Sequence, residues 1–189
     1  RVSSDQIVAC VGNTGGTVEV WSFDLTDLSN PPTLPVLSYS ANQAGVNSIS
    51  VALLKSSSYK RLIVATGGDD QAISCSVIDL QSTSKLRSVR RFKESCASAI
   101  KGIRIGGNSN SGLRLYASGY DQRMSVWSIE NIHEETILPS FLSSIPIDIK
   151  DINTLDSCTI MDSNGMSREI VVAAGEGMEL ASFDPQIWK

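Results

Sequence analysis

The chain has 189 residues, of which 41% are apolar, 19% charged and 6% aromatic. This length fits one domain with a hydrophobic core, and no run of about 18 apolar residues is present to span a membrane. The formal net charge of −4 argues against a generally basic nucleic-acid-binding protein. Because the sequence opens at Arg1 with no signal-peptide pattern, we expect it to be a fragment of a longer chain.

The cysteine and histidine content argues against metal and catalytic sites. The four cysteines lie far apart, form no Cys-x-x-Cys pair and occur without a glycosylation acceptor, so we expect free thiols in the reducing cytoplasm. His133 is the single histidine, and its polar surroundings predict a solvated loop. The acidic pairs 69–70 and 134–135 suggest no catalytic geometry, since neighbouring side chains on a strand point to opposite faces. The sequence therefore predicts no enzyme activity, no metal and no cofactor.

A repeat organises the chain. Residues 6–25, 61–80, 114–130 and 169–184 each contain an apolar strand, a glycine-rich turn and a second strand, as in a hairpin. The glycines that close the first strand of each hairpin are 55, 52 and 56 residues apart: Gly12, Gly67, Gly119 and Gly175. A period of this length indicates a repeat architecture.

Further strands are predicted between the hairpins, at 34–40, 46–54, 86–92, 99–105, 137–143 and 148–155. Four strands per unit, joined by short turns, are typical of a β-propeller blade. We therefore predict an all-β fold, a partial β-propeller of about three and a half four-stranded blades, with repeats around 6–41, 45–95, 98–143 and 147–184. The remainder of the ring would lie outside this chain. The polar segments 30–32, 55–60 and 106–112 are interpreted as solvated loops.

The repeats resemble the WD-repeat family. SGYDQRMSVW at 118–127 is similar to the family signature, TGGDDQAISCSV at 66–77 repeats it without the tryptophan, and TVEVWSF at 17–23 keeps the tryptophan. The resemblance implies that Asp70 and Asp121 accept backbone N–H bonds in tight turns, and that Trp21 and Trp127 pack between blades. The chain has no Gly-His pair and no tryptophan followed by aspartate, so the family's histidine-centred hydrogen-bond network is not expected.

A narrower resemblance is to the WD-repeat accessory subunits of tRNA ribose methyltransferases. It depends on four segments in order: AGVNS at 44–48, the run at 117–127, IPIDIKDI at 145–152 and GEGMEL at 175–180. The resemblance implies a non-catalytic scaffold that supports 2′-O-methylation of the tRNA wobble nucleotide by an FtsJ-like methyltransferase. The implied partners are that methyltransferase and the other propeller blades of the parent chain, and direct contact with tRNA is left open.

Charge is unevenly distributed along the chain. Residues 85–104 carry seven basic residues and one acid, a net +6, whereas the rest of the chain carries a net −10. Three interpretations remain open: phosphate contact, contact with an acidic protein partner, or an edge strand on which basic residues oppose sheet-to-sheet pairing. The candidate contact residues are Arg87, Arg90, Arg91 and Lys93. A general WD-repeat adaptor, in a signalling or ubiquitin-ligase assembly, is the alternative function.

Overall fold

The protein is all-β in the part of the chain that the structure describes. The computed structural model describes residues 5–55, 59–80, 85–93, 97–108, 112–130, 138–161, 163–164 and 167–183. In these ranges 14 strands form four antiparallel sheets, and none of the residues is helical. The described ranges accordingly hold no helix of the length and hydropathy needed to cross a membrane. The predicted all-β fold class is confirmed.

The strands of each sheet are consecutive in the chain, and neighbours in the sequence are neighbours in the sheet. The first sheet contains β1 (Gln6–Gly12), β2 (Thr17–Asp24) and β3 (Leu37–Ser40). The second contains β4 (Val46–Lys55), β5 (Lys60–Gly68), β6 (Ile73–Asp79) and β7 (Lys85–Phe92). The third contains β8 (Ile100–Asn108), β9 (Gly112–Gly119), β10 (Arg123–Glu130) and β11 (Leu138–Pro146). The fourth contains β12 (Thr154–Met161), β13 (Ser167–Gly175) and β14 (Gly177–Phe183).

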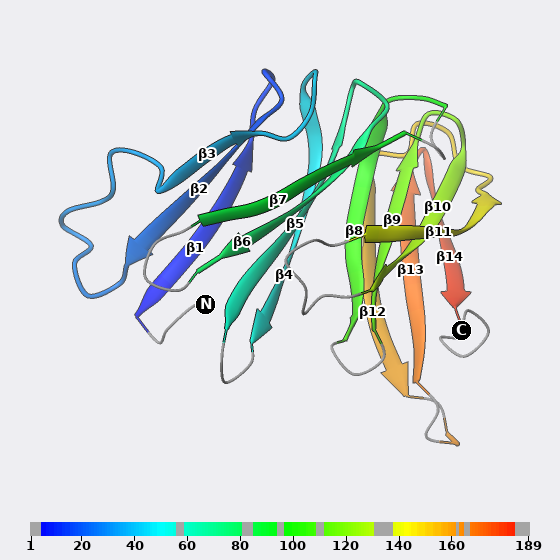
Figure 1. Cartoon of the computed structure of the whole chain (residues 1–189). Helices are drawn as coiled ribbons and strands as arrows, with labels where there is room; N and C mark the ends of the chain where they lie inside the picture. The colour runs from blue at the N-terminus through cyan, green and yellow to red at the C-terminus, as the bar shows by residue number, and fades with distance from the viewer. Residues whose placement is uncertain are drawn as a thin grey trace.

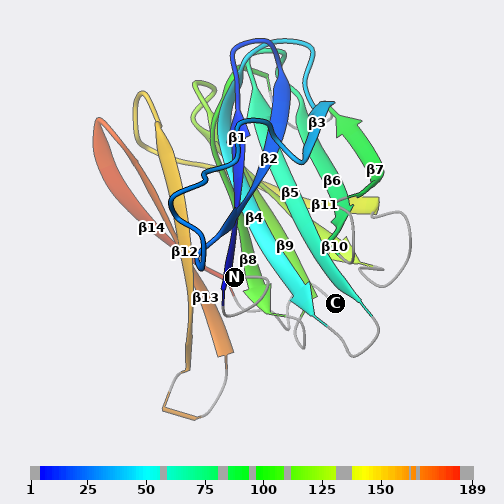
Figure 2. The same cartoon turned by 90° about the vertical axis from the view of Figure 1, so that its left-hand side faces the viewer.

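The four sheets stand side by side in chain order (Figure 1), and Figure 2 views the row from the side of the first sheet. One apolar cluster fills each space between neighbouring sheets, with Val18, Tyr39 and Ile78 in the first of them. The two middle sheets are therefore covered on both faces. Every residue of β6 is buried as a result, whereas burial alternates along β13 in the last sheet.

Two of the repeated glycines allow neighbouring sheets to approach closely. A Cβ atom on Gly12 would overlap the side chain of Val46, which begins β4, and a Cβ on Gly67 would overlap Ile100, which begins β8. Gly12 ends β1 and Gly67 is the next-to-last residue of β5, so each lies where its strand approaches the first strand of the next sheet. At these two positions the glycine thus reflects a packing requirement, because no side chain fits between the sheets there.

Two predicted segments differ from the structure. The strand predicted at 148–155 begins only at Thr154, and residues 147–153 lie outside any sheet, with a bend at 150–151. Ile147, Ile149 and Ile152 are buried in the cluster between the third and fourth sheets, so the apolar residues of this segment belong to a packed connection. Asp151 has φ 48°, a left-handed conformation that strands do not adopt.

The second difference concerns the loop predicted at 106–112. Residues 106–108 continue β8, and Gly112 already belongs to β9, while 109–111 lie outside the described residues. Gly107 and Gly112 both have positive φ, and Asn108 pairs with Gly112, so the two strands continue into this glycine-rich segment.

Candidate functional site

The basic segment lies largely on an edge strand. β7 pairs only with β6 and forms the last strand of the second sheet. Leu86 and Val89 of β7 pack on the apolar cluster between the first and second sheets. The basic residues on β7 and directly after it are exposed: Lys85, Arg87, Arg90, Arg91 and Lys93. This placement agrees with the prediction that basic residues line an edge, where unpaired N–H and C=O groups could otherwise recruit another strand.

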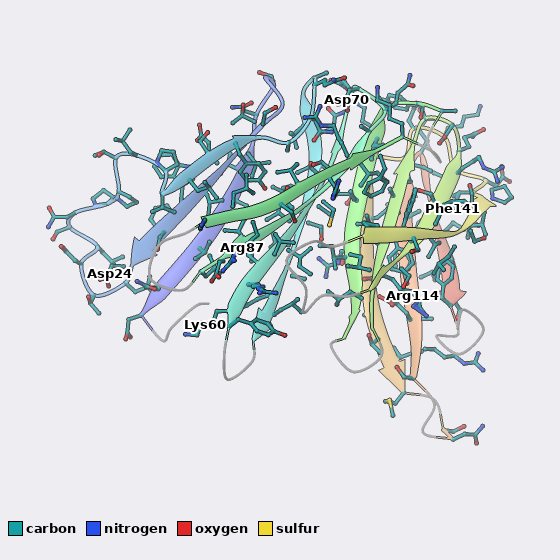
Figure 3. The ribbon with its side chains drawn as sticks, viewed as in Figure 1. Asp24, Lys60, Asp70, Arg87, Arg114 and Phe141 are labelled. Carbon is teal, nitrogen blue, oxygen red and sulfur yellow. The ribbon has the colours of Figure 1, made fainter. Side chains whose placement is uncertain are left out.

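The arginines of β7 do not form one continuous contact surface. The Nη2 atom of Arg87 lies 2.7 Å from the Oδ2 atom of Asp79 on β6, and the Asp79 side chain is only 11% exposed. Arg90 and Arg91 are consecutive on a regular strand, so their side chains leave opposite faces of the sheet. Arg87 therefore belongs to the packing of the sheet, as its position in Figure 3 illustrates.

Two other basic residues of the segment also pair with acids that lie outside it. Lys101 Nζ is 3.2 Å from Asp69 Oδ1, and Arg104 Nε is 3.1 Å from Asp156 Oδ1. Together with Arg87, three of the seven basic side chains of the segment are paired in this way. The local excess of positive charge in the sequence is thus much smaller on the surface.

Asp70 occupies the turn between β5 and β6, at the upper end of the sheets in Figure 3. Its Oδ1 accepts the backbone N–H of Ala72 at 3.1 Å, within the turn. Its Oδ2 accepts the N–H of Gln43 at 2.6 Å, in the segment that leads into β4. One carboxylate therefore fixes the turn and also the entry of the chain into the same sheet.

Asp121 makes a similar contact one sheet later. It lies in the turn between β9 and β10, and its Oδ2 accepts the backbone N–H of Ala97 at 3.0 Å. The backbone N–H of Asp121 in turn donates to Ser98 Oγ at 3.0 Å. Residues 97–98 lead into β8, so Asp121, like Asp70, connects the second turn of its sheet to the segment before the first strand.

Asn42 and Thr66 complete a buried network that the sequence did not reveal. Asn42 is 1% exposed; its Nδ2 donates to Asp70 Oδ1 and to the carbonyl of Ala72, at 3.1 and 3.0 Å. The hydroxyl of Thr66 donates to Asn42 Oδ1 at 2.7 Å. No histidine is needed, because an asparagine supplies both the donor and the acceptor. The only signal in the sequence was a polar residue next to a short strand.

The two tryptophans have different surroundings. Trp127 on β10 is 2% exposed, and its ring centroid is 4.5 Å from Phe92 of the second sheet and 5.1 Å from Phe141 of its own sheet. Trp21 on β2 is half-buried, and its Nε1 donates to Glu19 at 3.2 Å. Of these two tryptophans, Trp127 alone contacts an aromatic ring of a neighbouring sheet among the described residues.

Three of the cysteines fall in the described ranges, and all three are free: Cys10, Cys75 and Cys158. Burial raises the pKa of the Cys75 thiol to about 12 and that of Cys10 to about 11. In these same ranges no three His, Cys, Asp or Glu side chains are grouped so that they could hold a metal ion. Cys96, His133 and the acidic pair 134–135 lie outside the described residues.

Comparisons with known proteins add no relative. The chain matches no protein-family model, and it matches no curated protein.

Proposed function

We propose that the chain is part of a WD-type β-propeller that acts as a non-catalytic scaffold in the cytoplasm. The observation that carries this proposal is the repeated contact of Asp70 and Asp121 with the segment preceding the first strand of each sheet. A turn aspartate in this role is what the resemblance to WD repeats implies. Two consecutive four-stranded sheets, flanked in the described residues by two three-stranded ones and packed face to face with them, support the same architecture.

The end sheets support the presence of further blades in the parent chain. On the outer face of the first sheet, Ile7 and Val11 are 44% and 48% exposed. On the outer face of the last sheet, Met178 and Leu180 are 71% and 62% exposed. The middle sheets bury both of their faces, so further sheets of the same kind would cover these apolar residues.

The proposed role of the scaffold is to support 2′-O-methylation of the tRNA wobble nucleotide by an FtsJ-like methyltransferase. The support is the resemblance of residues 44–184 to accessory subunits of that type. We assign the methyltransferase, rather than tRNA, as the principal partner, because three of the seven basic side chains of residues 85–104 already pair with acids. Direct tRNA contact would depend mainly on Arg90, Arg91 and Lys93.

A general protein adaptor is the second candidate. It is favoured by the acidic character of one end of the sheets, the end with the turns β5–β6, β9–β10 and β13–β14. This end carries Asp69, Asp121, Asp148, Glu176 and Glu179. Such a surface repels phosphates and suits basic protein segments. Both candidates are binding functions, and they differ in whether the methyltransferase is the partner.

Depletion of the protein from its own cells tests the proposal directly. We expect the 2′-O-methyl group at the tRNA wobble position to decrease, and an FtsJ-like methyltransferase to co-purify with the tagged protein. Replacing Asp70 by alanine in the tagged protein should reduce both readouts, whereas Asp27→Ala, in the exposed β2–β3 connection, should not. Unchanged wobble methylation after depletion, with other proteins co-purifying reproducibly, would favour the adaptor.

A further inference from the structure

A groove of about 460 Å³ opens between the third and fourth sheets, at the end where the turns lie. The turn between β9 and β10 forms one wall, the segment that follows β11 forms the floor, and β14 forms the other wall. Pro146 and Ile147 give the floor an apolar character, and Ile147 is 4% exposed. The other lining residues are polar: Asp121, Gln122, Arg123, Asp148 and Glu179.

Hydrogen bonds connect the floor of the groove to both of its walls. The backbone N–H of Ile147 donates to the carbonyl of Gln122 at 2.9 Å, and Gln122 Nε2 donates to the carbonyl of Ile149 at 3.3 Å. The backbone N–H of Asp148 donates to Glu179 Oε2 at 2.8 Å, which connects the floor to β14. A site formed in advance loses little conformational entropy when a ligand binds.

The charges around the groove are predominantly negative. Arg123 is the one cation among the lining residues, and its Nε and Nη2 atoms are engaged by Ser144, at 2.8 and 3.0 Å. Asp121 and Glu179 each use one carboxylate oxygen on a backbone N–H, which leaves the other oxygen of each. None of the described residues donates a hydrogen bond to the Asp148 carboxylate.

We propose that this groove is a docking site for a lysine or arginine side chain of an extended segment of a partner protein. The aliphatic stem of such a side chain fits against Pro146 and Ile147, while its charged end reaches Asp148, Asp121 and Glu179. Charge complementarity favours a cationic side chain over a phosphate-bearing ligand, because the lining carries three carboxylates and one guanidinium. A metal ion fits less well, because in the described chain these carboxylates do not gather into a metal-holding group.

This docking site goes beyond the scaffold function and does not depend on it. The groove is lined by residues of the third and fourth sheets, of the β9–β10 turn and of the segment that joins the two sheets. The partner is defined only by its chemistry, as a protein that presents a lysine or arginine side chain. Whether that partner is a methyltransferase or another protein is a separate question, which wobble methylation answers.

The test is a titration of the isotopically labelled protein with N-acetylarginine methylamide, followed by backbone amide shifts in NMR spectra. We expect a saturable binding curve in the millimolar range, as is reasonable for a single side chain, with the largest shifts at residues 121–123, 147–148 and 179. The neutral isostere N-acetylcitrulline methylamide should produce at most one-fifth of the shift at the same concentration.

Variants make the test specific. The double variant Asp148→Asn/Glu179→Gln keeps both side-chain shapes and should weaken binding at least fivefold. Glu176→Gln changes a charge on the same end of the molecule without altering the groove lining, so it should change the affinity less than twofold. Equal weakening by Glu176→Gln, equal shifts with the citrulline probe, no shifts at all, or displacement of the probe by Ca²⁺ at equal concentration would each overturn the proposal.

Discussion

The indole ring of Trp127 and the ring of Phe92 lie with their centroids 4.5 Å apart, although they belong to different sheets. Trp127 comes from β10, in the middle of the third sheet, and Phe92 ends β7, at the edge of the second. Phe92 packs on the apolar cluster between the second and third sheets, which contains Trp127, so this cluster reaches the edge strand β7. The outer part of the interface between these sheets thus depends on one aromatic pair.

We expect Trp127→Ala to lower the free energy of unfolding by about 3–5 kcal/mol, as is typical for a large side chain removed from a core. Trp127→Phe should cost clearly less, because it keeps a ring against Phe92 and removes an indole N–H that is buried without a hydrogen-bond partner in the described structure. Trp21→Ala is the matched control and should cost less than Trp127→Ala, because Trp21 is only half-buried. Urea denaturation followed by circular dichroism measures all three; equal losses for both alanine variants would contradict the packing assigned to Trp127.

Asn42→Ala should destabilise the protein by about 1–3 kcal/mol, because it leaves buried polar groups of Thr66 and Ala72 without their partner. Asn30→Ala provides the control. Its amide contacts only Asp27 in an exposed connection, so we expect a change within about 0.5 kcal/mol. Thermal denaturation compares the two variants, and similar melting temperatures would indicate that the Asn42 network contributes little.

The hairpins could be predicted from the sequence, because their glycines and apolar alternation are local. The network of Asn42, Thr66 and Asp70 could not, since Asn42 is 28 residues from Asp70 and lies in a segment that looks like any polar connection. The strand predicted at 148–155 is wrong before Thr154, because the buried isoleucines of this segment pack on the cluster between two sheets without pairing with a strand. The groove depends on residues of two sheets and has no signature in the sequence.

Charge reversal on β7 should distinguish Arg87, which pairs with Asp79, from Arg90 and Arg91. Arg87→Glu places a second carboxylate beside Asp79, so we expect a loss of about 1–3 kcal/mol in the free energy of unfolding. Arg90→Glu and Arg91→Glu should change it by less than about 0.5 kcal/mol, because both residues are exposed. Chemical denaturation of the three single variants tests this, and a stable Arg87→Glu variant would show that the pair with Asp79 adds nothing.

The same variants address nucleic-acid binding. Because Arg90 and Arg91 leave opposite faces of β7, a tRNA backbone on one face should respond to only one of the two substitutions. We expect neither substitution to reduce tRNA binding more than twofold at physiological salt, measured by filter binding. A tenfold loss for Arg90→Glu or Arg91→Glu, with a smaller salt slope, would instead establish a phosphate contact at that arginine.

Thiol alkylation should distinguish the cysteines by position. Cys158 is exposed and should react with iodoacetamide at pH 8.5, whereas Cys75 is 1% exposed and burial raises its pKa to about 12. The thiolate is the reactive form, so Cys75 should remain unmodified until the protein unfolds. Peptide mass spectrometry with and without urea reads out each cysteine separately. Modification of Cys75 at the same rate as Cys158 in the folded protein would contradict the closed interface between the second and third sheets.

The contribution of Asp69 to stability should depend on pH. A hydrogen bond from Asn47 Nδ2 and the nearby Lys101 ammonium hold the pKa of the Asp69 carboxyl below its usual value. A carboxyl whose pKa is lower in the folded state stabilises the protein above the pKa of the unfolded chain, about 3.9, and this contribution is lost as the pH falls through the folded-state pKa. Asp69→Asn should therefore lower the urea midpoint at pH 7 and have a much smaller effect at pH 2.5. Asn47→Ala removes the main cause of the lowered pKa, so it should also reduce the difference in urea midpoint between pH 7 and pH 2.5. An Asp69→Asn effect of equal size at both pH values would show that the carboxylate charge is not involved.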